Sequence, residues 1–326
     1  MSSPEASKRH SLLSGVAEDR PGHAAALMVL ALFMLGFQDS IVKLTSDEVS
    51  LWQFQTIRAA INLTLLILLT RIIWGAKCPP PKRVWVVALR SLFLVGAMLC
   101  FFSGVPFLSL ANIAAGLYVF PLFVALLSAL LLGEKVGPQR IAAIVVGFSG
   151  TLLILKPGTE GFQLVSLMPI GAAFCYAAMI LTTRRLCREE SPVTLSFGVG
   201  ITFLTAGVAG LVLFSFLFKP EQASEWPYLL TGWHDIAWWV VGLIATCSCL
   251  NLTANIMLAR AYQSAEASWL APFDYSYIVF ATFWGYVFWQ HVPDPLTFLG
   301  MAMIASAGAF VAWREKIASE RAVADA

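Results

Sequence analysis

Charged residues are scarce in this chain. Only 12% of its 326 residues are Asp, Glu, Lys or Arg, whereas a soluble domain contains about 25%. The net charge is only +2, and the basic residues are spread along the sequence rather than clustered. Because a nucleic-acid-binding protein needs a basic patch or stripe, we expect no nucleic-acid partner.

Residues that carry catalysis or hold cofactors are also few. The four histidines fall in the polar leader and in predicted loops, so no nucleophile, base and metal ligands converge. The Gly-x-x-x-x-Gly-Lys phosphate loop is absent, so we expect any transport to be driven by a gradient or to run downhill. Cys247 and Cys249 lie in an apolar run and are interpreted as buried packing rather than a metal site. We therefore predict no enzymatic activity, no cofactor and no bound metal.

Long hydrophobic runs are what the chain does contain. Hydrophobic residues make up 59% of it and the mean hydropathy is +0.77. A helix needs about 20 residues to cross the hydrocarbon core of a bilayer, and we place ten runs near this length. They are 24–44, 52–73, 84–104, 108–132, 139–156, 163–183, 193–218, 236–259, 267–289 and 296–313. The sequence thus predicts an all-α integral membrane protein with ten transmembrane helices.

The distribution of basic residues predicts the orientation of these helices. Of the 21 Lys and Arg residues, most lie in alternate connecting segments, and the other set of segments holds only Lys43, Lys156 and Lys219. Cytoplasmic loops are the ones enriched in Lys and Arg. We therefore expect both termini to be cytoplasmic.

Internal similarity divides the chain into two halves. The matching pairs are Ala31–Lys43 with Ala172–Arg184, Trp85–Arg90 with Trp239–Ile244, and Phe120–Glu134 with Tyr277–His291. Because each half has five runs, an odd number, the second half enters the membrane from the opposite side, as in the inverted repeats of secondary transporters. We expect repeats at 24–156 and 163–313, a disordered cytoplasmic tail at 1–23 and a cytoplasmic tail at 314–326.

Short motifs recur in both halves with similar order and spacing. In the first half they are Leu110–Ala115, Phe120-Pro121, Leu132-Gly133-Glu134, Arg140 and Gly147–Gly150; in the second they are Ala271–Tyr275, Val292–Asp294, Gly300, Gly308 and Arg314-Glu315. From about residue 24 to 315 the chain resembles the EamA domain of the drug/metabolite transporter superfamily. One departure is that Gln290 and His291 stand where the family often has an acidic residue closing the ninth helix.

The resemblance implies a ten-helix carrier in the inner membrane of a bacterium. Members of this family export or import amino acids, nucleobases, riboflavin, S-adenosylmethionine and similar metabolites. It also implies a role for Glu134, which belongs to the family signature and closes the fourth helix. We expect Glu134 to anchor a gate or a helix end through an ion pair.

Two arginines inside the spans are candidates for substrate binding. An ionisable side chain at membrane depth is costly, so such residues face a cavity or a partner. Arg58 shares one helix face with Gln55 and Asn62, and Arg90 lies in the third span. Neither arginine has a counterpart in the second half, and a guanidinium suits carboxylate or phosphate. The alternative is that they form ion pairs with carboxylates on neighbouring helices.

Two carboxylates inside the spans are candidates for proton coupling. Asp274 falls near the middle of the ninth span, where a carboxyl can take up and release a proton. Its alternative role is a fixed hydrogen bond in a helix bent by Pro272. Asp39 lies one helical turn before Lys43, so it either takes part in transport or pairs with that lysine.

Further polar and aromatic residues complete the predicted substrate site. They are Tyr118, Asn251, Asn255, Trp269, Tyr275 and Tyr277. The alternative for the two asparagines is interhelical packing, and for the tryptophan and for Tyr275 and Tyr277 it is packing against lipid or within the core. We expect a secondary transporter that moves a small polar metabolite, amino-acid-like or bearing an anionic group, with protons as a further partner besides the bilayer. The alternative is a carrier of a larger nucleoside-, flavin- or S-adenosylmethionine-like compound, and a membrane-embedded enzyme is disfavoured.

Overall fold

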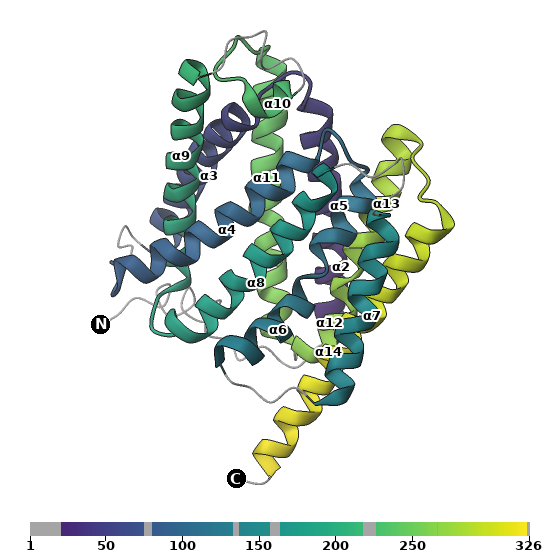
Figure 1. Cartoon of the computed structure of the whole chain (residues 1–326). Helices are drawn as coiled ribbons and strands as arrows, with labels where there is room; N and C mark the ends of the chain where they lie inside the picture. The colour runs from purple at the N-terminus through teal and green to yellow at the C-terminus, as the bar shows by residue number, and fades with distance from the viewer. Residues whose placement is uncertain are drawn as a thin grey trace, which may run out of the picture.

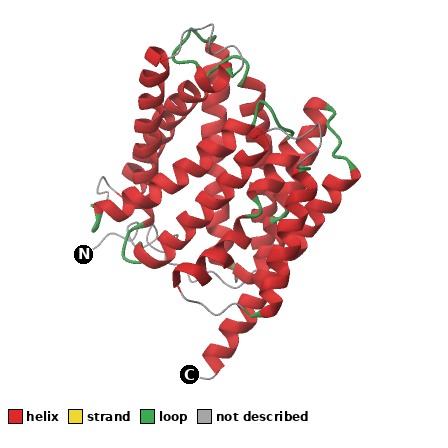
Figure 2. Cartoon of the chain, viewed as in Figure 1, coloured by secondary structure: helices red, strands yellow, loops and turns green. Residues whose placement is uncertain are grey.

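The computed structural model describes residues 21–74, 80–132, 137–156, 164–217, 226–265 and 267–324, and every regular element in this part is a helix (Figure 1). The first half contains α2 (Pro21–Thr45), α3 (Leu51–Trp74), α4 (Val84–Gly104), α5 (Leu110–Leu117), α6 (Phe120–Leu132) and α7 (Pro138–Leu155). The second contains the 3-10 turn η1 (Leu164–Leu167), α8 (Met168–Leu186), α9 (Pro192–Leu217), α10 (Pro227–Leu230), α11 (Trp238–Ser264), α12 (Ala267–Asp274), α13 (Ser276–Trp289) and α14 (Pro295–Ala324). Figure 2 shows the helices as one bundle joined by short loops.

The prediction of a multi-pass membrane protein is confirmed. Within the described residues, seven helices are long and apolar enough to cross a membrane: Gly22–Thr45, Leu51–Arg71, Val84–Gly104, Leu110–Leu131, Leu164–Leu186, Pro192–Phe216 and Trp238–Ser264. Ile141–Leu155 and Pro295–Val311 are apolar but shorter. Large hydrophobic side chains such as Phe216 and Trp238 lie exposed on the outside, as lipid contact requires. Length and composition thus support seven spans and do not confirm the predicted ten.

Two of the predicted spans are interrupted near their middle. The span predicted at 108–132 is divided into α5 and α6, with the break at Tyr118 and Val119. Pro121 follows the break, and a proline within the first turn of a helix needs no hydrogen-bonded N–H. The span predicted at 267–289 is divided into α12 and α13 at Tyr275. Each break places backbone and polar side chains inside the bundle, which is tolerated in a membrane only where protein or water surrounds them.

The main helix contacts join the two halves of the sequence. Helix α2 packs on α11, α4 on α8, α3 on α9 and α7 on α14 (Figure 1). Helix α2 also packs on α12 and α13, and α8 packs on α5 and α6. Neither half therefore forms a separate bundle, and the centre of the molecule lies between them.

Glycines allow a close contact between α7 and α14. A Cβ atom added to Gly150 would lie 2.7 Å from the carbonyl oxygen of Gly300, so a side chain at this position would collide with the neighbouring backbone. Close packing through small residues is the usual way for membrane helices to associate. The contact fixes the last helices of the two halves against each other.

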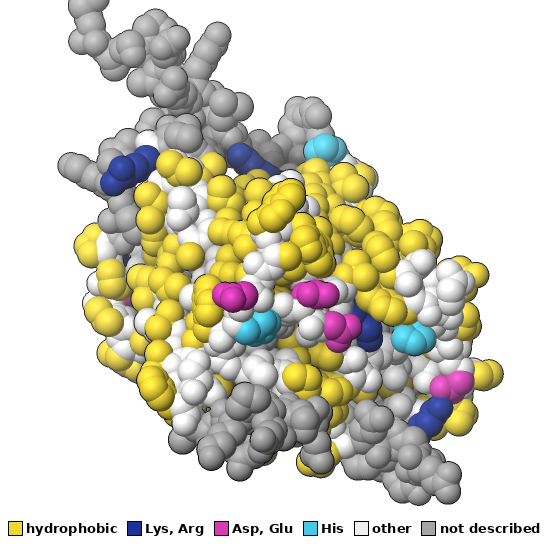
Figure 3. Space-filling model, turned by 90° about the horizontal axis from the view of Figure 1, so that it is seen from above, with side chains coloured by type: hydrophobic (Ala, Val, Ile, Leu, Met, Phe, Trp, Pro, Cys, Tyr) yellow, Lys and Arg dark blue, Asp and Glu magenta, His cyan; other side chains and the backbone are white. Residues whose placement is uncertain are grey.

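The ends of the chain are only partly described. Residues 1–20 of the predicted N-terminal tail lie outside the described residues, and helix α2 begins at Pro21. The segment 314–324, predicted as a tail, continues α14 as helix through Ala324. At the opposite end of the molecule, seen from above in Figure 3, a small group of acidic and His side chains lies among hydrophobic ones.

Candidate functional site

A cavity of about 560 Å³ lies at the centre of the bundle. It is lined by residues of α2, α3, α4, α8, α9 and α11, and by residues beside the two helix breaks. Its volume falls within the roughly 300–1,000 Å³ range of ligand sites in proteins. Central cavities beside interrupted helices are also where secondary transporters hold their substrates.

The cavity brings together nine of the residues that the sequence singled out. They are Asp39, Arg58, Asn62, Arg90, Tyr118, Asn251, Asn255, Asp274 and Tyr277. Asn255 also donates a hydrogen bond from Nδ2 to the carbonyl oxygen of Asn251 at 2.7 Å, so part of its amide is used within α11. Residues from six predicted spans thus meet at one place.

One end of the cavity is closed and contains Arg58. We call Gln38, Asp39, Gln55 and Arg58 the closed end; their exposed fractions are 2%, 6%, 2% and 8%. The Arg58 guanidinium lies 5.1 Å from the centre of the Phe102 ring, which is cation–π distance. Arg58 interacts electrostatically with Asp39, but it makes no ion pair or hydrogen bond through its side chain with any described residue.

The other end of the cavity is more exposed and contains Arg90. We call Arg90, Ser196, Asn255 and Tyr262 the open end; Arg90 is half-buried and the other three are exposed. The Nε atom of Arg90 donates to Oγ1 of Thr183 at 3.3 Å. That hydroxyl in turn donates to the carbonyl oxygen of Met179 at 2.8 Å. Among the described residues the Arg90 guanidinium therefore has one hydrogen-bond partner, and its other N–H groups can serve the cavity.

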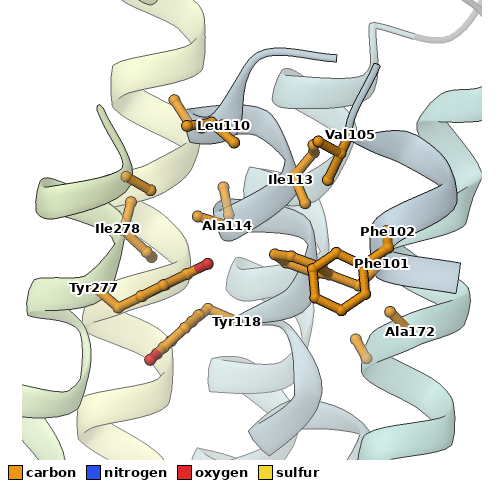
Figure 4. Close-up of a cluster of buried hydrophobic side chains, with 14 of the residues drawn as sticks. Phe101, Phe102, Val105, Leu110, Ile113, Ala114, Tyr118, Ala172, Tyr277 and Ile278 are labelled. Atoms are coloured by element: carbon orange, nitrogen blue, oxygen red, sulfur yellow. The ribbon is translucent and has the colours of Figure 1, made fainter. Parts of the chain in front are cut away.

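Two carboxylates and two tyrosines connect these ends. Asp39 accepts hydrogen bonds from the hydroxyl of Tyr277 and from Nε2 of Gln38, the second at 3.2 Å. Asp274 accepts one from the hydroxyl of Tyr118 at 3.5 Å. The rings of Tyr118 and Tyr277 are stacked, with centroids 5.4 Å apart and planes at 17°. Figure 4 shows these two side chains extending toward each other from different helices.

The helix breaks place this group of side chains. Ser109 caps α5 by accepting a hydrogen bond from the backbone N–H of Asn112, and α5 ends so that Tyr118 lies at the break. At the second break, Asp274 is the last residue of α12, and its carboxylate accepts the hydrogen bond from Tyr118. Both breaks thus turn a polar side chain toward the centre, where an uninterrupted apolar helix would place only packing residues.

Several predictions about individual residues need correction. Lys43 does not pair with Asp39: its ammonium donates to the carbonyl oxygen of Leu108 and lies 5.4 Å from the centre of the Trp289 ring. Tyr275 does not line the cavity, and its hydroxyl is directed at Gly308 of α14. The predicted ion pairs between the two arginines and the carboxylates do not form among the described residues, because neither arginine lies within 4 Å of a carboxylate.

Two of the predicted site residues cannot be placed in the same way. Trp269 belongs to α12, but its side chain lies outside the described part of the structure. Glu134, predicted to anchor a gate or helix end, also lies outside the described residues. Their predicted roles therefore stay predictions.

Sequence reasoning missed two tyrosines at the open end. Tyr176 of α8 and Tyr262 of α11 line the cavity and interact electrostatically with Asp274. Tyr176 also packs edge-on against Phe120, with ring centroids 5.0 Å apart. The available signal was a single hydroxyl-bearing ring within an otherwise apolar run, which is too common in membrane helices to identify a site.

A segment between α9 and α11 covers the closed end. We call residues 226–237 the cover segment; it includes α10. The Trp52 indole donates to the carbonyl oxygen of Leu229 at 2.7 Å, and Nε2 of Gln53 donates to that of His234 at 2.7 Å. Tyr228 of α10 is buried and interacts electrostatically with Arg58. The cover segment therefore separates Arg58 from the surface at the top of Figure 1.

An ion pair joins the two halves on the same face of the molecule. Nζ of Lys156, at the end of α7, lies 2.5 Å from Oδ2 of Asp294, just before α14. Asp294 also accepts hydrogen bonds from the backbone N–H groups of Leu296 and Thr297 and from the Thr297 hydroxyl. The hydrogen bond from Lys156, together with those from Thr297, lowers the pKa of Asp294 from 3.8 to about 2. Both partners of the ion pair are partly exposed.

The cavity offers hydrogen bonding rather than metal chemistry. Among the described residues, no group of three or more His, Cys, Asp or Glu side chains lies close enough to hold a metal ion. Its guanidinium, amide and phenol groups can instead fix the orientation of a polar organic molecule. Its rings, including Phe101, Phe102 and Phe120, offer apolar surface beside those groups.

Named relatives of this chain are transporters. A riboflavin transporter of Rhizobium johnstonii is 31% identical over 201 residues, which cover 62% of this chain and 61% of that protein. The pseudopaline exporter CntI of Pseudomonas aeruginosa is 27% identical over 285 residues, or 86% of this chain and 93% of the exporter. An S-adenosylmethionine uptake transporter of Rickettsia bellii is 23% identical over 282 residues, or 86% of this chain and 88% of that protein. The match to the riboflavin transporter thus spans about three fifths of its length.

The fold and the family agree with these relatives. A protein of known crystal structure superposes with a TM-score of 0.54 at 19% identity, covering 88% of this chain and 96% of that one, so the two share a fold. The EamA-like transporter family matches the sequence twice, over residues 23–156 and over residues 163–313. Because these two matches cover most of its length, the chain belongs to the EamA-like transporter family.

Proposed function

We propose that this protein is a secondary transporter that moves a small polar metabolite bearing an anionic group. The observation that carries this proposal is Arg58, a buried guanidinium without an ion-pair partner among the described residues, which lines a cavity together with Arg90. The family and the names of the relatives support transport rather than catalysis.

The energetics of Arg58 favour an anionic ligand. Burying a charge without a partner is costly, and removing a hydrogen-bonding partner from a buried charged group costs about 3 kcal/mol or more. A carboxylate or phosphate in the cavity would supply both the opposite charge and the acceptors that the guanidinium lacks. Arg90, at the open end, would attract the same anion as it enters.

We also propose that the bundle consists of ten spans arranged as two inverted repeats of five. The repeats are 24–156 and 163–313, followed by the cytoplasmic segment 314–326 and preceded by the cytoplasmic tail 1–23. If α5 with α6 and α12 with α13 each count as one interrupted span, and the four-residue elements η1 and α10 are left out, the helices number five in each half. The two separate family matches agree with this division.

The pattern of helix contacts supports the same symmetry. Exchanging each span for its counterpart in the other half turns the α2–α11 contact into the α8–α4 contact and leaves the α3–α9 and α7–α14 contacts unchanged. Such an arrangement permits one bundle to rock against the other around a central site. The excess of Lys and Arg in alternate loops favours cytoplasmic termini, and the bacterial relatives favour the inner membrane.

With this orientation the structure corresponds to the inward-facing state of an alternating-access cycle. The open end lies toward the cytoplasmic ends of α4, α9 and α11, where Arg90, Ser196 and Tyr262 are found. The closed end lies toward the outer face beneath the cover segment. In the alternate state the cover segment would separate from α3 and admit substrate from, or release it to, the outside.

The two carboxylates are our candidates for proton coupling. Asp39 and Asp274 both line the cavity, and each accepts a hydrogen bond from a tyrosine hydroxyl. A carboxylate that exchanges one tyrosine partner for a proton or a substrate cation can link substrate binding to proton movement. A role for Glu134 as a gate or helix-end anchor belongs to the same proposal.

A larger substrate is the second candidate function. The cavity has room for a flavin- or nucleoside-sized molecule, and aromatic rings line much of it. Relatives of this chain are named as riboflavin and S-adenosylmethionine transporters. Under this alternative the rings would stack on the ligand and the arginines would serve structure alone.

Transport into liposomes tests the proposal. We would reconstitute the protein and measure uptake of radiolabelled amino acids, organic acids, nucleosides, riboflavin and S-adenosylmethionine. We expect uptake of a compound that carries an anionic group, and we expect a variant with both Arg58→Ala and Arg90→Ala to lose it. The melting temperature of each purified protein would show whether the variant folds, and ligand at 100 times its Kd should stabilise the wild type by about 2.7 kcal/mol.

The outcomes separate the two candidate functions. Uptake of riboflavin or a nucleoside that is equal in wild type and variant would favour the larger substrate and remove the arginines from the site. Uptake of no compound above that of empty liposomes, by a protein that is folded, would contradict the proposed function.

A further inference from the structure

Unpaired hydrogen-bonding atoms are concentrated at the closed end. Oε1 of Gln38 and Nε2 of Gln55 are buried and have no hydrogen-bond partner among the described residues. The side chain of Arg58, one helical turn after Gln55 on α3, is likewise unpaired within the described part of the chain. Each buried polar group without a partner costs about 1–3 kcal/mol, and native proteins contain few of them.

Among the residues that line the cavity at the closed end, the unpaired atoms are divided by chemistry between two helices. Helix α3 contributes donors, namely the guanidinium of Arg58 and Nε2 of Gln55. Helix α2 contributes acceptors, namely Oε1 of Gln38, which has no partner among the described residues, and the carboxylate of Asp39, which already accepts hydrogen bonds from Gln38 and Tyr277. Arg58 and Asp39 interact electrostatically across the cavity without forming an ion pair, so donors and acceptors face each other and do not saturate each other.

We infer that the closed end binds a head group in which an anionic and a cationic group are adjacent, such as the α-carboxylate and α-ammonium of an amino-acid-like metabolite. The carboxylate would accept hydrogen bonds from Arg58 and Gln55. The ammonium would donate to Asp39 and Gln38. This inference rests on the proposed transport function and narrows its substrate class.

Each charged group of such a ligand would meet a side chain of opposite charge at the closed end. An anion alone would satisfy the donors of α3, but it would lie beside the Asp39 carboxylate and be repelled by it. A cation alone would satisfy the acceptors of α2, but it would lie beside the Arg58 guanidinium and be repelled by it. A zwitterion avoids both, and charge-assisted hydrogen bonds in a site with little water are the strongest available to it.

The rest of the cavity is suited to the remainder of the ligand. Leu94, Met98 and Phe120 line it beyond the closed end, and they offer apolar contact to a side chain. The Arg90 guanidinium lies farther toward the open end. The head group would therefore determine orientation, with the side chain directed toward the cytoplasmic opening.

Sets of three related compounds test this inference. For each amino-acid-bearing compound that the transport panel identifies, we would measure Kd for the parent, for its des-amino acid and for its decarboxylated amine. The measurement uses the full-length protein in detergent and the ligand-induced rise in melting temperature. We expect both analogues to bind at least about tenfold more weakly than the parent, because each leaves charged groups of the site unpaired.

Two variants assign the two charges to the two helices. Gln55→Leu should weaken the parent and the des-amino acid by about tenfold or less and leave the amine unchanged. Gln38→Leu should weaken the parent and the amine and leave the des-amino acid unchanged. Thr64→Val on α3 is a matched control, because the Thr64 hydroxyl is exposed and bonds only to the carbonyl oxygen of Ala60.

The possible outcomes distinguish a failure of the head-group inference from a failure of the proposed transport function. If wild type transports a compound without an amino-acid head group, transport stands and the inference is overturned. The inference is also overturned if a des-amino analogue binds as tightly as its parent. If both variants weaken all three compounds equally while the unliganded proteins melt normally, the assignment of charges to α2 and α3 is wrong. If the folded protein transports none of the compounds in the panel, the result contradicts the proposed transport function.

Discussion

Arg58 and Arg90 line the same cavity but lie in different surroundings. Arg58 is 8% exposed, contacts the face of Phe102 and is covered by the segment that contains α10. Arg90 is half-buried and shares a hydrogen bond with Thr183. The same side chain is therefore buried without a hydrogen-bond partner among the described residues at one end, and half-buried with one such partner at the other.

This difference indicates a division of labour. An electrostatic contact at a desolvated guanidinium is much stronger than one in water, so Arg58 can discriminate between ligands. A partly solvated guanidinium contributes mainly attraction over a distance, which raises the rate of encounter more than the affinity. The closed end should therefore determine which compound binds, and the open end how fast it arrives.

Exchanging each arginine for lysine tests the proposed difference between Arg58 and Arg90, and we expect the largest effect from these variants. Lysine keeps the positive charge but lacks the planar fork that meets a carboxylate with two hydrogen bonds. We expect Arg58→Lys to raise the Kd of the transported compound by about tenfold or more, the value of a charge-assisted hydrogen bond. Arg90→Lys should raise it by less than about threefold. Ligand-induced shifts in melting temperature of the two purified variants measure both values.

The salt dependence of binding provides the control. Screening should slow association in wild type and in Arg58→Lys alike, and it should affect Arg90→Ala less, because the solvated charge is the one removed. Equal losses of affinity in the two lysine variants would contradict the division of labour between the ends.

A second prediction concerns the hydrogen bonds that hold the cover segment over the closed end. Gln53→Leu removes the buried hydrogen bond to the carbonyl oxygen of His234, which is worth about 1 kcal/mol, and should increase the outward-open population about fivefold. Cys247 is a native reporter, since it is fully buried and its Sγ lies 3.7 Å from the carbonyl oxygen of Gln38. In a protein with Cys247 as its sole cysteine, labelling by an impermeant maleimide from the outer face should accelerate by the same factor.

A substitution in the cover segment itself serves as the control. Thr231→Val removes an exposed hydroxyl that bonds only within the segment, to the carbonyl oxygen of Pro227, and it should leave the labelling rate unchanged. Faster labelling in both variants would mean that the segment is loose in general. Unchanged labelling in Gln53→Leu would show that this hydrogen bond does not hold the outer end closed.

The bounds of several helices could be predicted from the sequence, because a transmembrane helix is a continuous run of apolar residues. The run predicted at 84–104 coincides with α4, and the run at 52–73 differs from α3 by one residue at each end. The breaks after α5 and α12 were harder to place, since they depend on contacts between distant helices. Proline signals such as Pro121 indicate that a helix bends, but they do not determine which residue stands at the break.

The sequence identified many residues of the candidate site, but it did not predict which of them form hydrogen bonds with each other. Arg58 and Asp39 were identified because an ionisable residue within an apolar run is rare. Their partners depend on how helices of the two halves approach each other. The alternative in which Asp39 pairs with Lys43 is therefore not found, and the hydrogen bond from Tyr277 was not predicted. Tyr228 could not be found at all, because its place near Arg58 follows from the path of a loop.

Of the interactions considered, we expect removal of the Lys156–Asp294 ion pair to have the smallest effect on stability and on opening of the closed end. It joins the halves on the same face as the cover segment, but its side chains are 34% and 44% exposed, and exposed ion pairs contribute less than about 1 kcal/mol. Asp294→Asn keeps a good helix cap for α14 and removes only the charge. We expect it to lower the melting temperature by at most a few degrees and to leave the labelling rate of Cys247 unchanged.

The pH dependence of this difference follows from the lowered pKa of Asp294. Because the pKa is about 2 in the folded protein and 3.8 ordinarily, the stabilising contribution is fully present above pH 4 and is lost as the pH falls toward 2. The melting temperatures of wild type and Asp294→Asn should therefore differ by a constant amount from pH 5 to pH 8 and converge below pH 4. A larger effect of Asp294→Asn than of Gln53→Leu on Cys247 labelling would mean that the exposed pair, rather than the buried contacts around Arg58, keeps the outer end closed.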